Sequence, residues 1–160
     1  GSLLLSAVPV RQEVDRVVEG LRKVYHDKDP LIESDIGEGI QFRGDKGDLL
    51  EVVANLLDNA CKWCQRRVRI VVRTSGAGET ASRGMTITVS DDGPGIPEEA
   101  ADALLQRGTR LDESTPGHGI GLAVVKDIAQ SYGGDLSITA SDLGGAEIRV
   151  ELPSRQAGAR

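Results

Sequence analysis

The sequence predicts an α/β two-layer sandwich, in which a sheet of about five strands, mixed and mostly antiparallel, is covered on one face by three helices. The first observation is the order of the periodic segments, which is a helix followed by two strands, three times over. The second is the length of 160 residues, which suits one hydrophobic core. The third is the scarcity of aromatic residues, because one Trp, one Phe and two Tyr leave the core to Val, Leu, Ile and Ala.

The first half of the chain predicts two helices separated by two short strands. Apolar residues recur at helical spacing from about 11 to 26. Short extended segments follow at 31–33 and 40–43, with a turn-prone stretch at 35–39 between them. A longer helix is expected over about 47–64, where Asp45 or Asp48 near its start suits the helix dipole.

The second half predicts strands at 68–73 and 85–89, joined by a Gly, Ser and Ala-rich loop at 75–84. The stretch 91–97 fits neither a helix nor a strand, and a short helix is expected around 98–105. A third long helix opens at the glycine-rich segment 117–121 and runs to about Tyr132, where Gly133 ends it. A hairpin of strands 136–140 and 146–152 closes the fold.

The helix around 51–63 carries an unusual polar face. Its apolar stripe comprises Leu49, Val52, Val53, Leu56, Leu57 and Ala60. At about 100° per residue, four polar residues lie within about 80° of one another on the far side, namely Glu51, Asn55, Asn59 and Lys62. A solvated face is the ordinary explanation, but Asn is a mediocre helix former. These four residues form a polar column along the helix. Amide oxygens beside a carboxylate suit Mg²⁺, and a lysine at the end of the column suits phosphate.

Asp91 is expected to point into the core. It continues the register of Met85, Ile87 and Val89, whereas Asp92 points away. A buried carboxylate is costly unless it is paired, and Gly93 and Gly95 let backbone approach a ligand closely. Asp91 could therefore accept a hydrogen bond from a ligand amine, although a turn with a helix-capping Asp would also explain this segment.

The glycine-rich segment 117–122 predicts an anion site at a helix N-terminus. No strand precedes it, as a dinucleotide-binding fingerprint requires, and the sequence contains no G-x-x-x-x-G-K-[ST] P-loop. Arg110, in the preceding loop, could contact the same phosphates.

In order, these motifs are Glu51-x-x-x-Asn55-x-x-x-Asn59-Ala60-Cys61-Lys62, Asp91-x-Gly93-x-Gly95 and Gly117-x-Gly119-x-Gly121-Leu122. They resemble the N, G1 and G2 boxes of the GHKL superfamily of ATPases and kinases, in its sensor histidine kinase form. The similarity runs from Asp45 to Pro153, and 55–64 and 91–97 are most similar to PhoQ-type sensor kinases. The resemblance implies a Bergerat (GHKL) fold with an ATP lid at about 98–117, within a single catalytic ATP-binding domain over 3–160. It also implies a protein-histidine kinase that uses ATP and Mg²⁺.

The resemblance implies roles for individual residues. Asp91 would bind the adenine amino group, with Gly93, Gly95 and Ile96 beside it and Trp63 as a stacking wall. Asn55 would hold Mg²⁺, helped by Asn59 and His118, while Lys62 and Arg110 would neutralise phosphate charge. The phosphates would be clasped by Gly117, His118, Gly119, Ile120, Gly121 and Leu122. Glu51 occupies the place of a general base in water-activating relatives, and in a kinase it would polarise the acceptor His; the sequence leaves both roles open.

Three departures from the family pattern concern the lid. Leu104-Leu105-Gln106-Arg107 stands where relatives carry phenylalanines, His118 stands where close relatives tend to have Gln, and Thr115 stands at the position of a second lid Arg. Lid closure and neutralisation of phosphate charge are the steps that these changes affect.

The resemblance also implies partners outside this chain. The family's phosphoacceptor His lies on a separate dimerising helical hairpin, and a Pro follows it five residues later in its motif. In this chain Pro30 follows His26 four residues later, so His26 does not fit that motif. We therefore expect the hairpin to be absent, the chain to be monomeric and unable to phosphorylate itself, and a response regulator to be reached through the hairpin. Gly1 and Ser2 are typical of a cloning scar.

Composition excludes other classes of function. A net charge of −6 and few aromatic rings argue against nucleic-acid binding. No apolar stretch approaches the roughly 18–20 residues of a membrane span, and there is no secretion signal, so we expect a soluble, cytoplasmic fragment. The resemblance implies that the parent protein is an inner-membrane sensor. Cys61 and Cys64 cannot close a four-ligand zinc site alone. The remaining alternatives are a nucleotide-gated binding module without transfer and an ATPase of the chaperone or topoisomerase kind.

Overall fold

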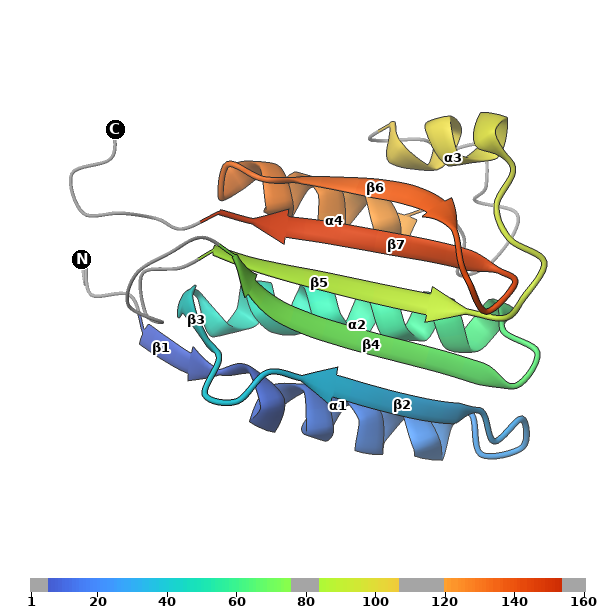
Figure 1. The fold of residues 1–160 in the computed structure, drawn as a ribbon, viewed down its shortest axis with the longest axis horizontal. Coiled ribbons are helices and arrows are strands. Elements are labelled where there is room, and N and C mark those ends of the chain that lie inside the picture. Colours follow the sequence, from blue (N-terminus) through green and yellow to red (C-terminus); the bar gives the residue numbers. More distant parts are fainter. Residues whose placement is uncertain (1–5, 76–83, 107–119, 154–160) are drawn as a thin grey trace.

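The computed structural model describes residues 6–75, 84–106 and 120–153. Within them, three helices cover one face of a five-stranded sheet of order β2-β4-β5-β7-β6 (Figure 1). The helices are α1 (Val10–Val24), α2 (Lys46–Trp63), α3 (Glu98–Leu105) and α4 (Ile120–Ser131), of which α1, α2 and α4 form the covering layer. The strands are β1 (Ser6–Pro9), β2 (Leu31–Ile36), β3 (Gln41–Gly44), β4 (Arg67–Ser75), β5 (Gly84–Asp91), β6 (Asp135–Ala140) and β7 (Ala146–Leu152). The predicted two-layer sandwich is confirmed.

The sheet is mixed because one of its strand pairs is parallel. β2 runs parallel to β4, with Leu31 opposite Arg67, while β4–β5, β5–β7 and β6–β7 are antiparallel. The parallel pair requires a crossover, which β3 and α2 supply. The β5–β7 pair brings Asp91, at the end of β5, beside Ala146, at the start of β7.

Two elements differ from the sequence expectation. The segment at 40–43 forms β3, which pairs with β1 in a separate two-stranded sheet rather than with the main sheet. β1 was not predicted, because a four-residue strand that ends in proline has almost no periodic signal. The short helix expected around 98–105 is α3, as predicted, and it packs against α4 beside the covering layer.

The second helix matches its prediction closely. Its N-cap is Asp45, whose side chain accepts a hydrogen bond from the N–H of Asp48 at 3.1 Å. All six residues of the predicted apolar stripe are buried, at 1% exposure or less, which fixes the polar column on the opposite side. Among the described helices, none is both long enough and apolar enough to cross a membrane.

Candidate functional site

The predicted motifs meet at one end of the sheet. This end comprises the C-terminus of β5, the last turns of α2, the start of α4 and the turn between β6 and β7. A Cβ built on Gly121 of α4 would lie 2.9 Å from Oδ1 of Asn55 on α2. A Cβ on Gly93 would lie 2.2 Å from the carbonyl oxygen of Trp63. Glycine therefore lets the second and third motifs approach the first closely.

Asp91 lies at the centre of this arrangement, as its position in the strand register predicts. It is only 3% exposed. Its Oδ1 accepts hydrogen bonds from the N–H of Gly93 at 2.8 Å and of Ala146 at 3.3 Å, while Oδ2 accepts neither of them. The carboxylate is thus held by backbone on one oxygen and can offer the other to a hydrogen-bond donor.

Burial raises the pKa of Asp91 above its usual value, because a charged carboxylate loses its hydration there. The hydrogen bonds from Gly93 and Ala146 oppose this shift, as does the positive charge of Lys28, but they do not cancel it. A buried acid with a perturbed pKa at the end of a strand is a common mark of a functional site.

The β6–β7 turn supports Asp91 in a way that the sequence did not reveal. The N–H of Gly145 donates to the carbonyl oxygen of Asp91 at 3.0 Å. A Cβ on Gly145 would lie 2.2 Å from Oδ1 of Asp91 and 2.5 Å from the nitrogen of Gly93. The sequence predicted a turn at the paired glycines 144 and 145. It did not predict the contact of this turn with Asp91, because that contact arises only when β5 and β7 are neighbours in the sheet.

Asp92 points away from the core, as predicted, and has a structural task. Its carboxylate accepts hydrogen bonds from the backbone N–H groups of Gln65, Arg66 and Arg67, at 2.8 to 3.2 Å. Burial alone would raise its pKa, but these bonds outweigh burial and hold the pKa below its usual value. Asp92 therefore anchors the connection between α2 and β4, next to Trp63.

The polar column of α2 lies beside Gly121. The side-chain amide of Asn55 donates to the carbonyl oxygen of Glu51 at 2.7 Å, which turns its Oδ1 toward α4. The amide nitrogen of Asn59 is buried and has no hydrogen-bond partner among the described residues. Glu51 is exposed, Lys62 is half-buried and Trp63 is 39% exposed. Together these groups present oxygen acceptors, amide donors and one cation along a single helix face.

The amide oxygens of this column fit Mg²⁺ bound together with phosphates. In the part of the chain that the structure describes, no group of three His, Cys, Asp or Glu residues could hold a metal ion alone. Mg²⁺ commonly takes only one or two protein ligands and completes its shell with phosphate oxygens and water. Asn55 and Asn59 are residues that could supply such ligands.

Several predicted site residues lie outside the described residues, namely Arg110, Thr115, Gly117, His118 and Gly119. The same is true of most of the predicted lid. Of the glycine-rich motif, the structure describes the backbone from Ile120 onward and the side chain of Leu122, which is 2% exposed and belongs to the core.

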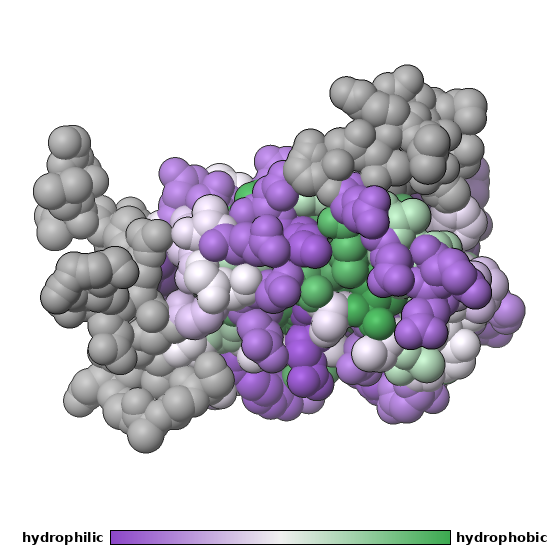
Figure 2. All heavy atoms as spheres, turned by 90° about the horizontal axis from the view of Figure 1, so that it is seen from above, coloured by the Kyte–Doolittle hydropathy of each residue, from purple (hydrophilic) through white to green (hydrophobic). Residues whose placement is uncertain are grey.

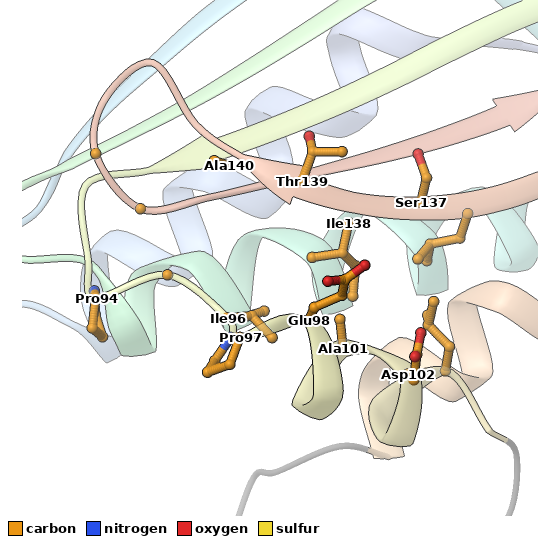
Figure 3. Close-up of a pocket in the computed structure, with 15 residues that line it drawn as sticks. Pro94, Ile96, Pro97, Glu98, Ala101, Asp102, Ser137, Ile138, Thr139 and Ala140 are labelled. Carbon is orange, nitrogen blue, oxygen red and sulfur yellow. The ribbon is translucent and has the colours of Figure 1, made fainter.

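A groove of about 690 Å³ adjoins the site. Gly95, Ile96 and Gly145 line it, together with α3 and β6, and Figure 3 shows Ile138 and Glu98 pointing toward each other across it. Viewed from the β6 side, a small apolar area lies among hydrophilic side chains (Figure 2). The lining does not include Asp91 or any residue of the polar column, so the groove and the column are separate surfaces.

The two cysteines belong to the core and not to a reactive pair. Both are buried and free. Burial raises the pKa of Cys61 to about 12 and also raises that of Cys64, so neither is a thiolate at neutral pH.

The family model described as "Histidine kinase-, DNA gyrase B-, and HSP90-like ATPase" matches residues 44–156. The chain belongs to this family. Within the histidine kinase, gyrase B and HSP90-like ATPases it corresponds to the ATP-binding catalytic domain of sensor histidine kinases, as its three motifs predict.

Two curated relatives are similar to this chain. The sensor protein kinase CarS of Pseudomonas aeruginosa is 48% identical over 120 residues, which are 75% of this chain and 26% of that protein. The sensor protein PhoQ of Escherichia coli K12 is 40% identical over 152 residues, which are 94% of this chain and 30% of that protein. This chain spans less than a third of the length of either relative. The solved structure of the mycobacterial sensor histidine kinase MprB matches with a TM-score of 0.74 and 30% identity, covering 96% of this chain and 100% of that one.

Proposed function

We propose that this domain binds ATP with Mg²⁺ and transfers the γ-phosphoryl group to a histidine on a separate dimerisation domain of the same parent protein. The observation that carries the proposal is the buried carboxylate of Asp91, which backbone N–H groups hold through Oδ1 at the edge of the sheet. Few ligand groups suit such a carboxylate as well as an exocyclic amine, and adenine has one.

The base would lie between Asp91 and the last turn of α2. Oδ2 of Asp91 would accept a hydrogen bond from the adenine amino group. Trp63, the only Trp in the chain, follows Lys62 at the end of α2 and is 39% exposed. Its indole offers a stacking surface. Gly93 lets the strand end carrying Asp91 approach the end of α2 closely, and Gly95 and Ile96 would lie beside the ring.

The phosphates would lie toward the start of α4. The N-terminus of α4 offers free N–H groups and the positive end of a helix dipole. Lys62 and Arg110 would add positive charge, and Asn55, Asn59 and His118 would hold Mg²⁺. Bound Mg²⁺ would neutralise negative charge that develops on the phosphates during transfer. Glu51, exposed one turn before Asn55, would orient the incoming acceptor histidine.

The acceptor is expected from outside this chain. His26 is exposed and lies on the turn after α1, where its Nδ1 is 3.2 Å from a carboxylate oxygen of Asp27. We propose that the acceptor hairpin belongs to the parent protein, that a response regulator then takes the phosphoryl group from it, and that the parent is an inner-membrane sensor with this domain on the cytoplasmic side.

The test combines this chain with the isolated helical hairpin of its parent and γ-labelled ATP. Labelled hairpin is expected only when chain, hairpin and Mg²⁺ are all present, and no stable label is expected on the chain alone. Asp91→Asn should abolish labelling, whereas the matched variant Asp15→Asn, at an exposed position on α1, should not. ATP-dependent binding of the hairpin without label would instead favour a binding module, and steady phosphate release without hairpin would favour an ATPase.

A further inference from the structure

The turn between α1 and β2 contacts the end of α2 in a way that neither the motifs nor the family match explains. This turn comprises residues 25–30, outside the matched range 44–156. Nζ of Lys28 lies 2.8 Å from the carbonyl oxygen of Cys61 and 2.8 Å from that of Lys62, and donates to both. The last carbonyls of a helix lack partners within the helix, and a positive charge is favourable there because of the helix dipole.

The conformation of the turn explains why Lys28 reaches these carbonyls. On one side, the hydroxyl of Tyr25 donates to Oδ1 of Asp58 on α2 at 2.7 Å. On the other, the N–H of Leu31 donates to the carbonyl oxygen of Arg66 at 2.7 Å. Between them Asp29 has a φ of 51°, and its N–H donates to the carbonyl oxygen of Tyr25 at 2.7 Å. The chain on both sides of Lys28 is thus tied to α2 and to the segment that follows it.

The two carbonyl groups that accept hydrogen bonds from Lys28 lie in the last turn of α2, which borders the candidate nucleotide site. Lys62 and Trp63 are the last two residues of α2, and the carbonyl of Trp63 is the group that Gly93 approaches most closely. The N–H of Gly93 in turn donates to Asp91. A continuous path of contacts therefore leads from Lys28 through the end of α2 to Asp91.

We propose that Lys28 is a positioning residue of the nucleotide site, which fixes the last turn of α2 and so sets the place of Lys62 and Trp63. The proposal rests on the proposed function of this site. Lys28 itself need not touch the nucleotide, because its two hydrogen bonds act on the backbone that carries the binding side chains.

The test compares three variants of the full chain. Lys28→Met removes the charge and the donors, Lys28→Arg retains both, and Lys23→Met removes an exposed lysine from α1 as a matched control. Two quantities are measured, namely acrylamide quenching of Trp63 fluorescence without nucleotide, and the Kd for Mg–ADP by calorimetry. Lys28→Met is expected to increase quenching and to raise the Kd about three- to tenfold. Lys28→Arg should restore both quantities, and Lys23→Met should alter neither.

The proposal is overturned if Lys28→Met matches Lys23→Met in either quantity, or if Lys28→Arg fails to restore the affinity. Failure of the underlying function is distinguishable, because the unsubstituted chain would then bind no Mg–ADP. Quenching would still show whether Lys28 fixes the last turn of α2.

Discussion

The adjacent carboxylates Asp91 and Asp92 have opposite environments, and strand periodicity separated them correctly. Alternation along β5 placed Asp91 inside and Asp92 outside, and the structure confirms both positions. What alternation could not show is the partner of each carboxylate. The N–H of Ala146 and those of 65–67 come from segments distant in sequence, so their contacts follow from strand order and not from local pattern.

The two carboxylates should give opposite pH dependences of stability. The pKa of Asp91 is raised by burial, so its charge destabilises the folded chain at neutral pH, and this cost disappears as the pH falls through the raised pKa. Asp91→Asn should therefore raise the Tm at pH 7, with a smaller gain at lower pH. The pKa of Asp92 is lowered despite its burial, so its contribution is present above about pH 4, the usual pKa of Asp, and is lost as the pH falls further.

Asp92→Asn should accordingly lower the Tm at pH 7, and this loss should shrink on acidification. Thermal melts of both variants and the unsubstituted chain between pH 3 and 8 measure the differences. Shifts of the same sign at neutral pH would contradict the assigned environments.

At the scale of elements, periodicity located the first two long helices, the end of the third and the central strands to within about two residues, because each has one buried face. For example, the helix expected at 47–64 is Lys46–Trp63. β1 was missed because a four-residue strand is too short to show a period. The short helix α3 was expected at 98–105 and lies there, but nothing local showed that it packs against α4. The turn between β6 and β7 was located, but its support of Asp91 was not.

Gly145→Ala should test that support. The new methyl group would collide with Oδ1 of Asp91 and the nitrogen of Gly93. Overpacking of this kind typically costs about 1–3 kcal/mol, which corresponds to a fall in Tm of roughly 3–10 °C for a domain of this size. Mg–ADP should also bind more weakly, because the carboxylate is displaced.

The control for this substitution is Gly20→Ala in the interior of α1. A Cβ there meets nothing within 4 Å, so the helix should gain about 0.5–1 kcal/mol. Thermal melts and calorimetry of both variants give the comparison. Equal or greater stability of Gly145→Ala would show that the β6–β7 turn does not constrain Asp91.

For the whole molecule, segment order and a single apolar core were sufficient to predict the sandwich. The strand neighbours were not predictable in the same way. β2 pairs in parallel with β4 across an intervening helix, and no local turn encodes that contact. The proximity of the three motifs came from the resemblance to a known family, because spacing alone does not supply it; the structure places Gly121 beside Asn55 and Gly93 beside Trp63, and the roles of the site residues stay predictions.

Binding of nucleotide should stabilise the entire domain. With Mg–ADP at about one hundred times its Kd, the gain is about 2.7 kcal/mol, or roughly 5–10 °C in Tm. Differential scanning fluorimetry with and without Mg–ADP measures this shift. Asp91→Asn, which retains an oxygen for the N–H groups of Gly93 and Ala146 but loses the carboxylate, should show almost none. A full shift in Asp91→Asn would remove Asp91 from the proposed site.

The pairing of β5 with β7 has a consequence for how the molecule folds. β4 with β5 and β6 with β7 are sequence neighbours and can form early, whereas the β5–β7 contact, with Met85 opposite Leu152, closes a long loop and is slow to form. Asp91 and Ala146 lie at the end of this late contact. The proposed pocket for the base therefore does not exist in either hairpin alone, and affinity for the nucleotide is expected only in a chain in which the β5–β7 contact has formed.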